Sequence, residues 1–198
     1  MKRTALLLAL AASMLAATPS AFAEITYYRA TMSGPSEAPP NASPGAGIAS
    51  IIIDDVAHTM QLNVPFFDLI GTTTAAHIHC CTFDPLAGTA MVATRLPTFP
   101  DFPGGVQSGL YTRTLDLTDP ASYNPAFITA FGGTAATAET ALLNGINLNQ
   151  SYLNIHTTEY PGGEIRGFLV QSPIPEPASW AMLGVGLAGI AFSLRKRA

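Results

Sequence analysis

Residues Tyr152–Gly167 read Tyr-Leu-Asn-Ile-His-Thr-Thr-Glu-Tyr-Pro-Gly-Gly-Glu-Ile-Arg-Gly, and the fold class follows from this stretch. Apolar and polar residues alternate along its first half. Side chains of a strand repeat every two residues, so Asn154 and His156 share one face. The alternation stops at Pro161–Gly163, where Pro followed by two Gly is typical of a tight turn. The pattern predicts a β-hairpin whose second strand is Glu164–Val170.

A second stretch, Ala75–Cys80, has the same character and places His77 and His79 on one face. If it lies beside the strand that carries His156, three imidazole groups share that face. Imidazole nitrogen prefers copper, zinc or nickel to calcium, so His77, His79 and His156 form a candidate site for copper or zinc. The alternative is that this face is simply polar, either solvated or joined in a hydrogen-bonded network between the two strands.

Short alternating segments with turn residues between them occupy most of the chain, and this spacing predicts an all-β fold, an antiparallel β-sandwich with one or two short helices. The expected strands are 24–33, 47–54, 58–66, 75–80, 90–96, 109–117 and the two strands of the 152–170 hairpin, and the expected helical segments are 119–131 and 134–143, the second ending at Asn144-Gly145.

The residues Glu164 and Arg166 are expected on the same face as Asn154, in an ion pair or a polar network across the hairpin. A single carboxylate without a second titratable partner does not make an acid–base pair. The sequence contains no nucleophile elbow, phosphate loop or dinucleotide fingerprint. We therefore assign no catalytic residue and favour a protein that is not an enzyme.

Both ends of the chain have the composition of targeting segments. Residues 1–23 carry Lys2 and Arg3, an apolar run and a small-residue site, which predicts a signal peptide removed by signal peptidase between Ala23 and Glu24. Residues 172–198 carry Pro175-Glu176-Pro177, an apolar run at 181–194 and a terminal Arg195-Lys196-Arg197. This run predicts a C-terminal transmembrane helix with its basic end in the cytoplasm, so the folded domain is expected at 24–171.

The predicted mature segment, Glu24–Ile174, contains 12 acidic residues, four arginines and no lysine, which gives a formal charge of −8. Nucleic acids and anionic membrane surfaces are bound mainly through Lys and Arg. The composition therefore argues against both as partners.

The two cysteines, Cys80 and Cys81, are adjacent. In an oxidising compartment they can form a vicinal disulfide, which closes no loop. Free or buried thiols, metal ligation and an intermolecular bond are the alternatives.

The C-terminal segment resembles the PEP-CTERM sorting signal of Gram-negative bacteria, in which a Pro-Glu-Pro motif, an apolar helix and a basic cluster occur in this order. The resemblance implies an exosortase as partner, transient anchoring in the inner membrane, removal of the tail near Pro175–Pro177, and release to the cell surface or its exopolysaccharide. A plain C-terminal anchor is the alternative.

Residues between about 26 and 170 resemble the CHRD domain. The resemblance lies in Ser33-Gly34 with Glu37–Pro40, in Ala75–His79, in a helix expected near Glu139–Gly145, and in Tyr152–Thr157 with Tyr160–Gly167. It implies an immunoglobulin-like sandwich and no established reaction. The expected function is a binding or structural role outside the cell, with an extracellular polysaccharide or protein as partner. The sequence departs from the common bacterial pattern after His79, where Cys80-Cys81 and a segment rich in Pro and aromatic residues replace a plainer turn.

The histidine pattern is also similar to copper/zinc superoxide dismutase, a β-sandwich in which a His-x-His strand and a histidine from a late strand hold copper. His77, His79 and His156 match these positions loosely. The fourth copper ligand and the zinc loop of that family have no counterpart in this sequence.

Overall fold

The computed structural model describes residues 25–173. The signal peptide predicted at 1–23, its cleavage site at Ala23 and Glu24, the sorting motif Pro175-Glu176-Pro177 and the apolar helix predicted at 181–194 lie outside the described residues. None of the helices within residues 25–173 has the length and apolarity that crossing a bilayer requires.

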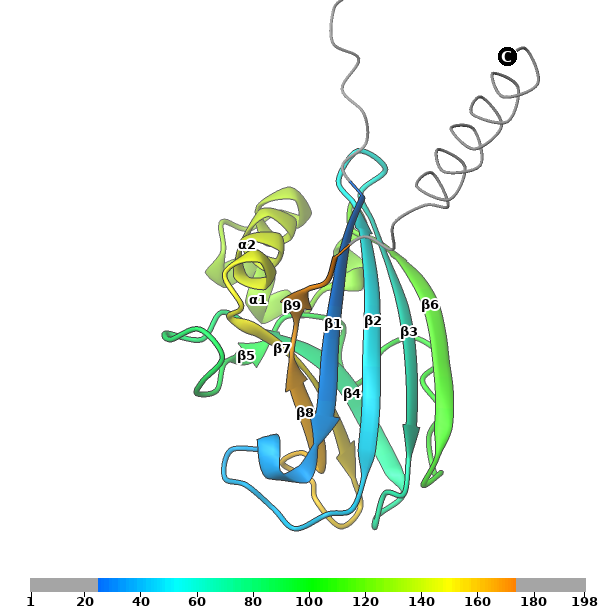
Figure 1. Cartoon of the computed structure of the whole chain (residues 1–198). Helices are drawn as coiled ribbons and strands as arrows, with labels where there is room; N and C mark the ends of the chain where they lie inside the picture. Colours follow the sequence, from blue (N-terminus) through cyan, green and yellow to red (C-terminus); the bar gives the residue numbers. More distant parts are fainter. Residues whose placement is uncertain (1–24, 174–198) are drawn as a thin grey trace, which may run out of the picture.

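Nine strands form one antiparallel sheet, in the order β5-β4-β7-β8-β1-β2-β3-β6, with β9 paired to β1 (Figure 1). Their bounds are β1 Ile25–Ser33, β2 Ala46–Asp54, β3 Thr59–Phe67, β4 Thr73–Cys80, β5 Met91–Val92, β6 Gly109–Asp116, β7 Ser151–Thr157, β8 Ile165–Phe168 and β9 Val170–Gln171. The predicted antiparallel all-β class is confirmed, and most predicted strands agree with the observed ones to within two residues. The strand predicted at 90–96 is wrong in length, because only Met91–Val92 pairs with β4 as a strand.

The sheet curls on itself, so that β4 and β7 pass behind β1, β2 and β3 (Figure 1). The two facing halves give the fold its sandwich-like form, although one continuous sheet makes both layers. Alternating apolar side chains from both halves fill the space between them, among them Met32, Ile51, Met60, Leu62, Val64, Phe66, Ile78, Leu153, Ile155 and Ile165, all buried. Burial of this apolar surface is the main stabilising contribution to such a fold.

Local turn chemistry explains the β2–β3 hairpin. The carboxylate of Asp54 accepts hydrogen bonds from the backbone N–H groups of Val56 and Ala57, at 3.1 and 2.8 Å. Asp side chains commonly stabilise turns in this way. His58 then adopts a positive φ of 51° before β3 begins.

The helices lie together at one end of the sheet (Figure 1). The segment predicted as helical at 119–131 is a 3-10 turn, Pro120–Ser122, followed by α1, Pro125–Ala130, because Asn124 caps a new helix that starts with Pro125. The second helix, α2, spans Ala135–Asn147, so its predicted end at Asn144-Gly145 is wrong.

Gly145 lies inside α2 because the helix passes close to the end of β4. A Cβ atom at this position would collide with the sulfur atoms of Cys80 and Cys81. These two cysteines form a disulfide, which is one of the alternatives left open by the sequence. The glycine therefore serves close packing rather than helix termination.

Candidate metal centre

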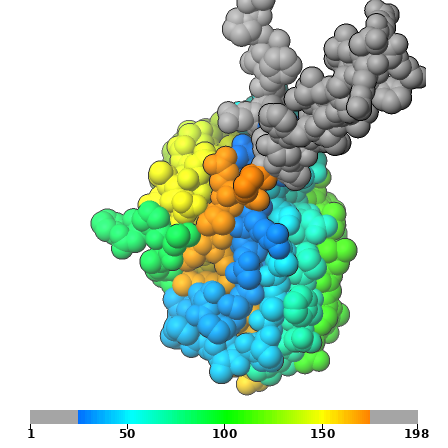
Figure 2. Space-filling model, viewed as in Figure 1, coloured from blue at the N-terminus to red at the C-terminus, as the bar shows by residue number. Residues whose placement is uncertain are grey.

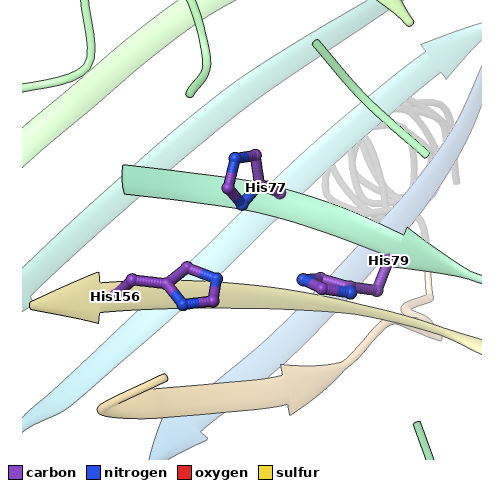
Figure 3. Close-up of side chains that lie close together, drawn as sticks. All are labelled: His77, His79 and His156. Atoms are coloured by element: carbon purple, nitrogen blue, oxygen red, sulfur yellow. The ribbon is translucent and has the colours of Figure 1, made fainter. Parts of the chain in front are cut away.

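Strand pairing brings the three predicted histidines together. β4 and β7 are antiparallel neighbours, with Ala75 opposite His156, His77 opposite Asn154, and His79 opposite Tyr152. Residues opposite each other in a sheet point to the same face. His77 and His79 from β4 and His156 from β7 therefore meet on the face of the sheet that points away from the core (Figure 3).

Each ring offers one nitrogen as a ligand, and these three nitrogens all lie within 4.8 Å of one another. Three atoms at this spacing share a point that is no more than about 2.8 Å from any of them, whereas metal–nitrogen bonds to histidine are about 2.0–2.1 Å. Ring movements of less than about 1 Å would thus bring all three nitrogens to bonding distance from a shared ion.

Each ring is oriented by a backbone carbonyl from a covering loop. His77 Nε2 donates to the carbonyl of Pro97 at 2.6 Å, His79 Nδ1 to that of Ala90 at 2.9 Å, and His156 Nδ1 to that of Pro161 at 2.9 Å. Because a carbonyl oxygen only accepts, the nitrogen that faces it carries the hydrogen. The other nitrogen of each neutral ring then presents its lone pair.

The remaining nitrogens are His77 Nδ1, His79 Nε2 and His156 Nε2, and all three are buried with no hydrogen-bond partner among the described residues. A buried polar atom without a partner is costly and uncommon in folded proteins. A ring that donates one N–H to a carbonyl and directs the other nitrogen inward is the usual arrangement of a metal-binding histidine.

Burial keeps the three rings neutral. It lowers the pKa of His77 and of His156 below the ordinary value, and it lowers the pKa of His79 to about 4. Desolvation disfavours the charged imidazolium, and for His77 and His79 the neighbouring histidines act in the same direction. Metal ligation requires the unprotonated nitrogen, so the rings are ready to bind at neutral pH.

An aromatic and cationic layer lies beside the histidines. The ring of Tyr152 stacks on His79 with 4.8 Å between centroids, and the guanidinium of Arg166 lies 4.8 Å from the Tyr152 centroid. Arg166 donates from Nε to the carbonyl of Ser36 and from Nη1 to the carbonyl of Gly88, at 2.5 and 3.0 Å. The cation is therefore fixed in place by two loops.

Glu37 is the carboxylate closest to this cation, with its Oε2 3.9 Å from Arg166 Nε. Burial raises the pKa of Glu37 to about 7, although Arg166 and a hydrogen bond from Asn154 act in the opposite direction. Asn154 lies in the same buried region, and its Oδ1 has no partner among the described residues. Of the expected network residues, Arg166 and Asn154 thus lie beside the histidines.

Glu164, the third expected network residue, lies in a separate network. Its carboxylate accepts hydrogen bonds from the hydroxyls of Ser43 and Thr157, each at 2.6 Å, and from the N–H groups of Ile70 and Gly71 at 2.5 and 3.1 Å. Burial alone would raise the pKa of Glu164, but these four hydrogen bonds together hold it below its ordinary value.

The fourth histidine of the chain, His58, is outside the site and contacts Glu139 of α2 through Nδ1 at 2.9 Å. This contact raises the pKa of His58 through a hydrogen bond and the charge of the carboxylate.

Several groups that shape the site carry no sequence signal. The carbonyls of Ala90, Pro97 and Pro161 orient the rings, but every residue has a carbonyl, so composition cannot identify them. Tyr152 could have been found from the sequence, because it precedes His156 by four residues and therefore lies on the same face of the strand.

Comparison with known protein families gives two matches. A family model for the CHRD domain matches residues 28–169, and one for the PEP-CTERM protein-sorting motif matches residues 173–197. The comparison with curated proteins and that with solved structures return no match. Both resemblances expected from the sequence are therefore confirmed.

Proposed function

The chain belongs to the CHRD domain family, and on this premise we propose that its domain is a non-enzymatic module that binds a transition metal, copper or zinc, outside the cell. His77, His79 and His156 are the proposed ligands. The observation that carries the proposal is that one nitrogen from each of the three rings lies within 4.8 Å of the others, while each ring has a buried nitrogen without a hydrogen-bond partner among the described residues.

The sorting motif supports the extracellular location in this proposal. The combination of a CHRD domain with a PEP-CTERM motif identifies an exported protein that an exosortase sorts to the cell envelope or surface. Release from the inner membrane after tail removal, and residence in the exopolysaccharide, are parts of the proposal.

The ligand chemistry supports copper or zinc. Imidazole nitrogens suit these ions, whereas calcium and magnesium prefer oxygen ligands. The carbonyl hydrogen bonds hold the rings in position before an ion arrives, which lowers the entropic cost of binding.

Metal titration of the full-length protein tests the proposal. We expect one Cu²⁺ or Zn²⁺ per chain, and His79→Ala should weaken binding by at least about 100-fold because one of three ligands is lost. His58→Asn is the matched control, since it removes a histidine that lies outside the site. Equal affinity in the wild type and His79→Ala would overturn the proposal. Rapid turnover of a small substrate by the metal-loaded protein would overturn its non-enzymatic part.

A second candidate function is the binding of an extracellular polysaccharide or protein. A cavity of about 330 Å³ lies between the loop Glu37–Asn41 and the turn Glu159–Gly163, and Pro39, Pro40 and Tyr160 line it. An aromatic ring beside proline surfaces is a common platform for sugars and extended peptides. Tyr160→Ala should abolish binding to isolated exopolysaccharide in a sedimentation assay, while His79→Ala should leave it unchanged. Unchanged binding by Tyr160→Ala would exclude this cavity as the site.

A further inference from the structure

The ligand set of the three-histidine site carries no negative charge. Among the His, Cys, Asp and Glu side chains of the described residues, the cluster within 4.8 Å consists of His77, His79 and His156 alone. All three are neutral imidazoles. A divalent ion at this site would therefore keep its full double charge in a buried environment, which is unfavourable.

A fixed positive charge packs beside the ligands, one aromatic ring away from His79. The Arg166 guanidinium packs on Tyr152, whose ring in turn stacks on His79. Glu37, at 3.9 Å from Arg166, at most cancels this charge, so the pair adds no net negative charge near the ion.

The number of ligands also separates the candidate ions. A zinc ion held by three protein ligands takes a water molecule as its fourth ligand, and Cu²⁺ prefers tetragonal sites, so both ions need room for further ligands beside the three nitrogens. The monovalent ion Cu⁺ has a filled d shell and is stable with two or three ligands. Three convergent nitrogens on a covered face match the needs of this ion best.

We propose that the three-histidine site selects monovalent copper, Cu⁺, over Zn²⁺ and Cu²⁺. This inference rests on the proposed function, because it names the ion and the oxidation state that the same three residues hold. A carrier or store of Cu⁺ at the cell surface is the role that such selectivity supports.

Competition titrations of the full-length protein measure the selectivity. Cu⁺ is titrated without oxygen against bicinchoninate, Zn²⁺ against a coloured chelator, and Cu²⁺ is followed by electron paramagnetic resonance. We expect one Cu⁺ per chain, bound at least about 100-fold more tightly than Zn²⁺ and more tightly than Cu²⁺.

Substitution of Ala75 tests the charge argument without removing a ligand. Ala75 lies two residues before His77 on the same strand and opposite His156. Ala75→Asp therefore adds an anionic oxygen to this face, and Ala75→Asn is the neutral control of the same size. We expect Ala75→Asp to shift the Zn²⁺/Cu⁺ affinity ratio toward Zn²⁺ by at least about tenfold relative to Ala75→Asn.

The possible failures are distinguishable. If the wild type binds none of the three ions, the proposed function is wrong. If Zn²⁺ or Cu²⁺ binds as tightly as Cu⁺, the proposed function stands and the selectivity is wrong. If Ala75→Asp and Ala75→Asn have the same affinity ratio, the charge argument for Cu⁺ is wrong.

Discussion

Glu37 is a buried carboxyl group that changes charge near neutral pH, because burial raises its pKa from 4.5 to about 7. The folded protein therefore holds this proton at pH values where the unfolded chain has lost it. Between about pH 4.5 and 7 the folded state binds more protons, so this group makes the free energy of unfolding fall as the pH rises through that window.

Replacement by the neutral isostere should remove this contribution. We expect Glu37→Gln to match the wild type at pH 4.5 and to be more stable by about 1–3 kcal/mol at pH 8, in urea unfolding at several pH values. Glu159→Gln, an exposed substitution on the neighbouring turn, is the control. Parallel pH profiles of Glu37→Gln and the wild type would contradict the prediction.

Glu164 presents the opposite case, since four donated hydrogen bonds hold its pKa below the ordinary value. Its stabilising contribution is present above the pKa of the unfolded chain and is lost as the pH falls through the folded pKa. Glu164→Gln places an NH₂ group against these donors, so at pH 7 we expect a loss of at least about 2 kcal/mol in the free energy of unfolding. The measurement is urea unfolding, and a loss no larger than that of Glu159→Gln would contradict this role.

At the scale of elements, the alternating pattern was sufficient to predict that β4 and β7 are strands with their histidines on one face. It also placed the turn at Pro161–Gly163 correctly. The order of the sheet and the loops that cover the histidines depend on contacts between distant residues, for which local pattern contains no information. For the same reason, the separation of Glu164 from Arg166 could not be read from their spacing, because Glu164 precedes the start of β8 and its side chain is bound by other segments.

Gly145 shows how a correct local rule can fail. Glycine after Asn144 is a common helix end, yet here α2 continues to Asn147 because the missing side chain lets the helix approach the disulfide. Alanine normally stabilises a helix interior by about 1 kcal/mol relative to glycine. We expect Gly145→Ala instead to destabilise the protein by about 2–3 kcal/mol through overpacking.

Thermal unfolding of Gly145→Ala beside Asn144→Ala tests this prediction. Asn144 is the exposed neighbour on the same helix, so its replacement changes helix propensity without a steric clash. A melting temperature of Gly145→Ala at or above that of the wild type would show that the sheet and helix can separate without cost.

At the scale of the whole molecule, one curled sheet supplies both the core and the outer face on which the histidines meet. A loop between β4 and β5 protrudes from the body of the molecule (Figure 2). It carries the apolar residue Phe83, which is 96 % accessible. Ala90, whose carbonyl orients His79, also belongs to the connection between β4 and β5. The protruding loop is therefore directly linked to the candidate metal site.

The sorting motif leads to a prediction for the exported protein. Replacing Pro175, Glu176 and Pro177 by alanine should prevent tail removal, because the motif is the feature that an exosortase is expected to recognise. Mass spectrometry of the protein isolated from the cell envelope measures the outcome, with the triple alanine replacement of Arg195, Lys196 and Arg197 as a comparison. A processed form of unchanged mass would contradict recognition through Pro-Glu-Pro.

The two ends of the described body lie side by side, since Tyr28 of β1 pairs with Gln171 of β9 and the N–H of Ser172 donates to the carbonyl of Tyr27 at 2.7 Å. A domain whose two ends lie side by side can be inserted into a surface loop of an unrelated host protein, or repeated in tandem, with little distortion of its neighbours. The fold is thus suited to duplication and transplantation, and grafting it into a fluorescent protein would be a practical way to report metal capture by a change in light emission.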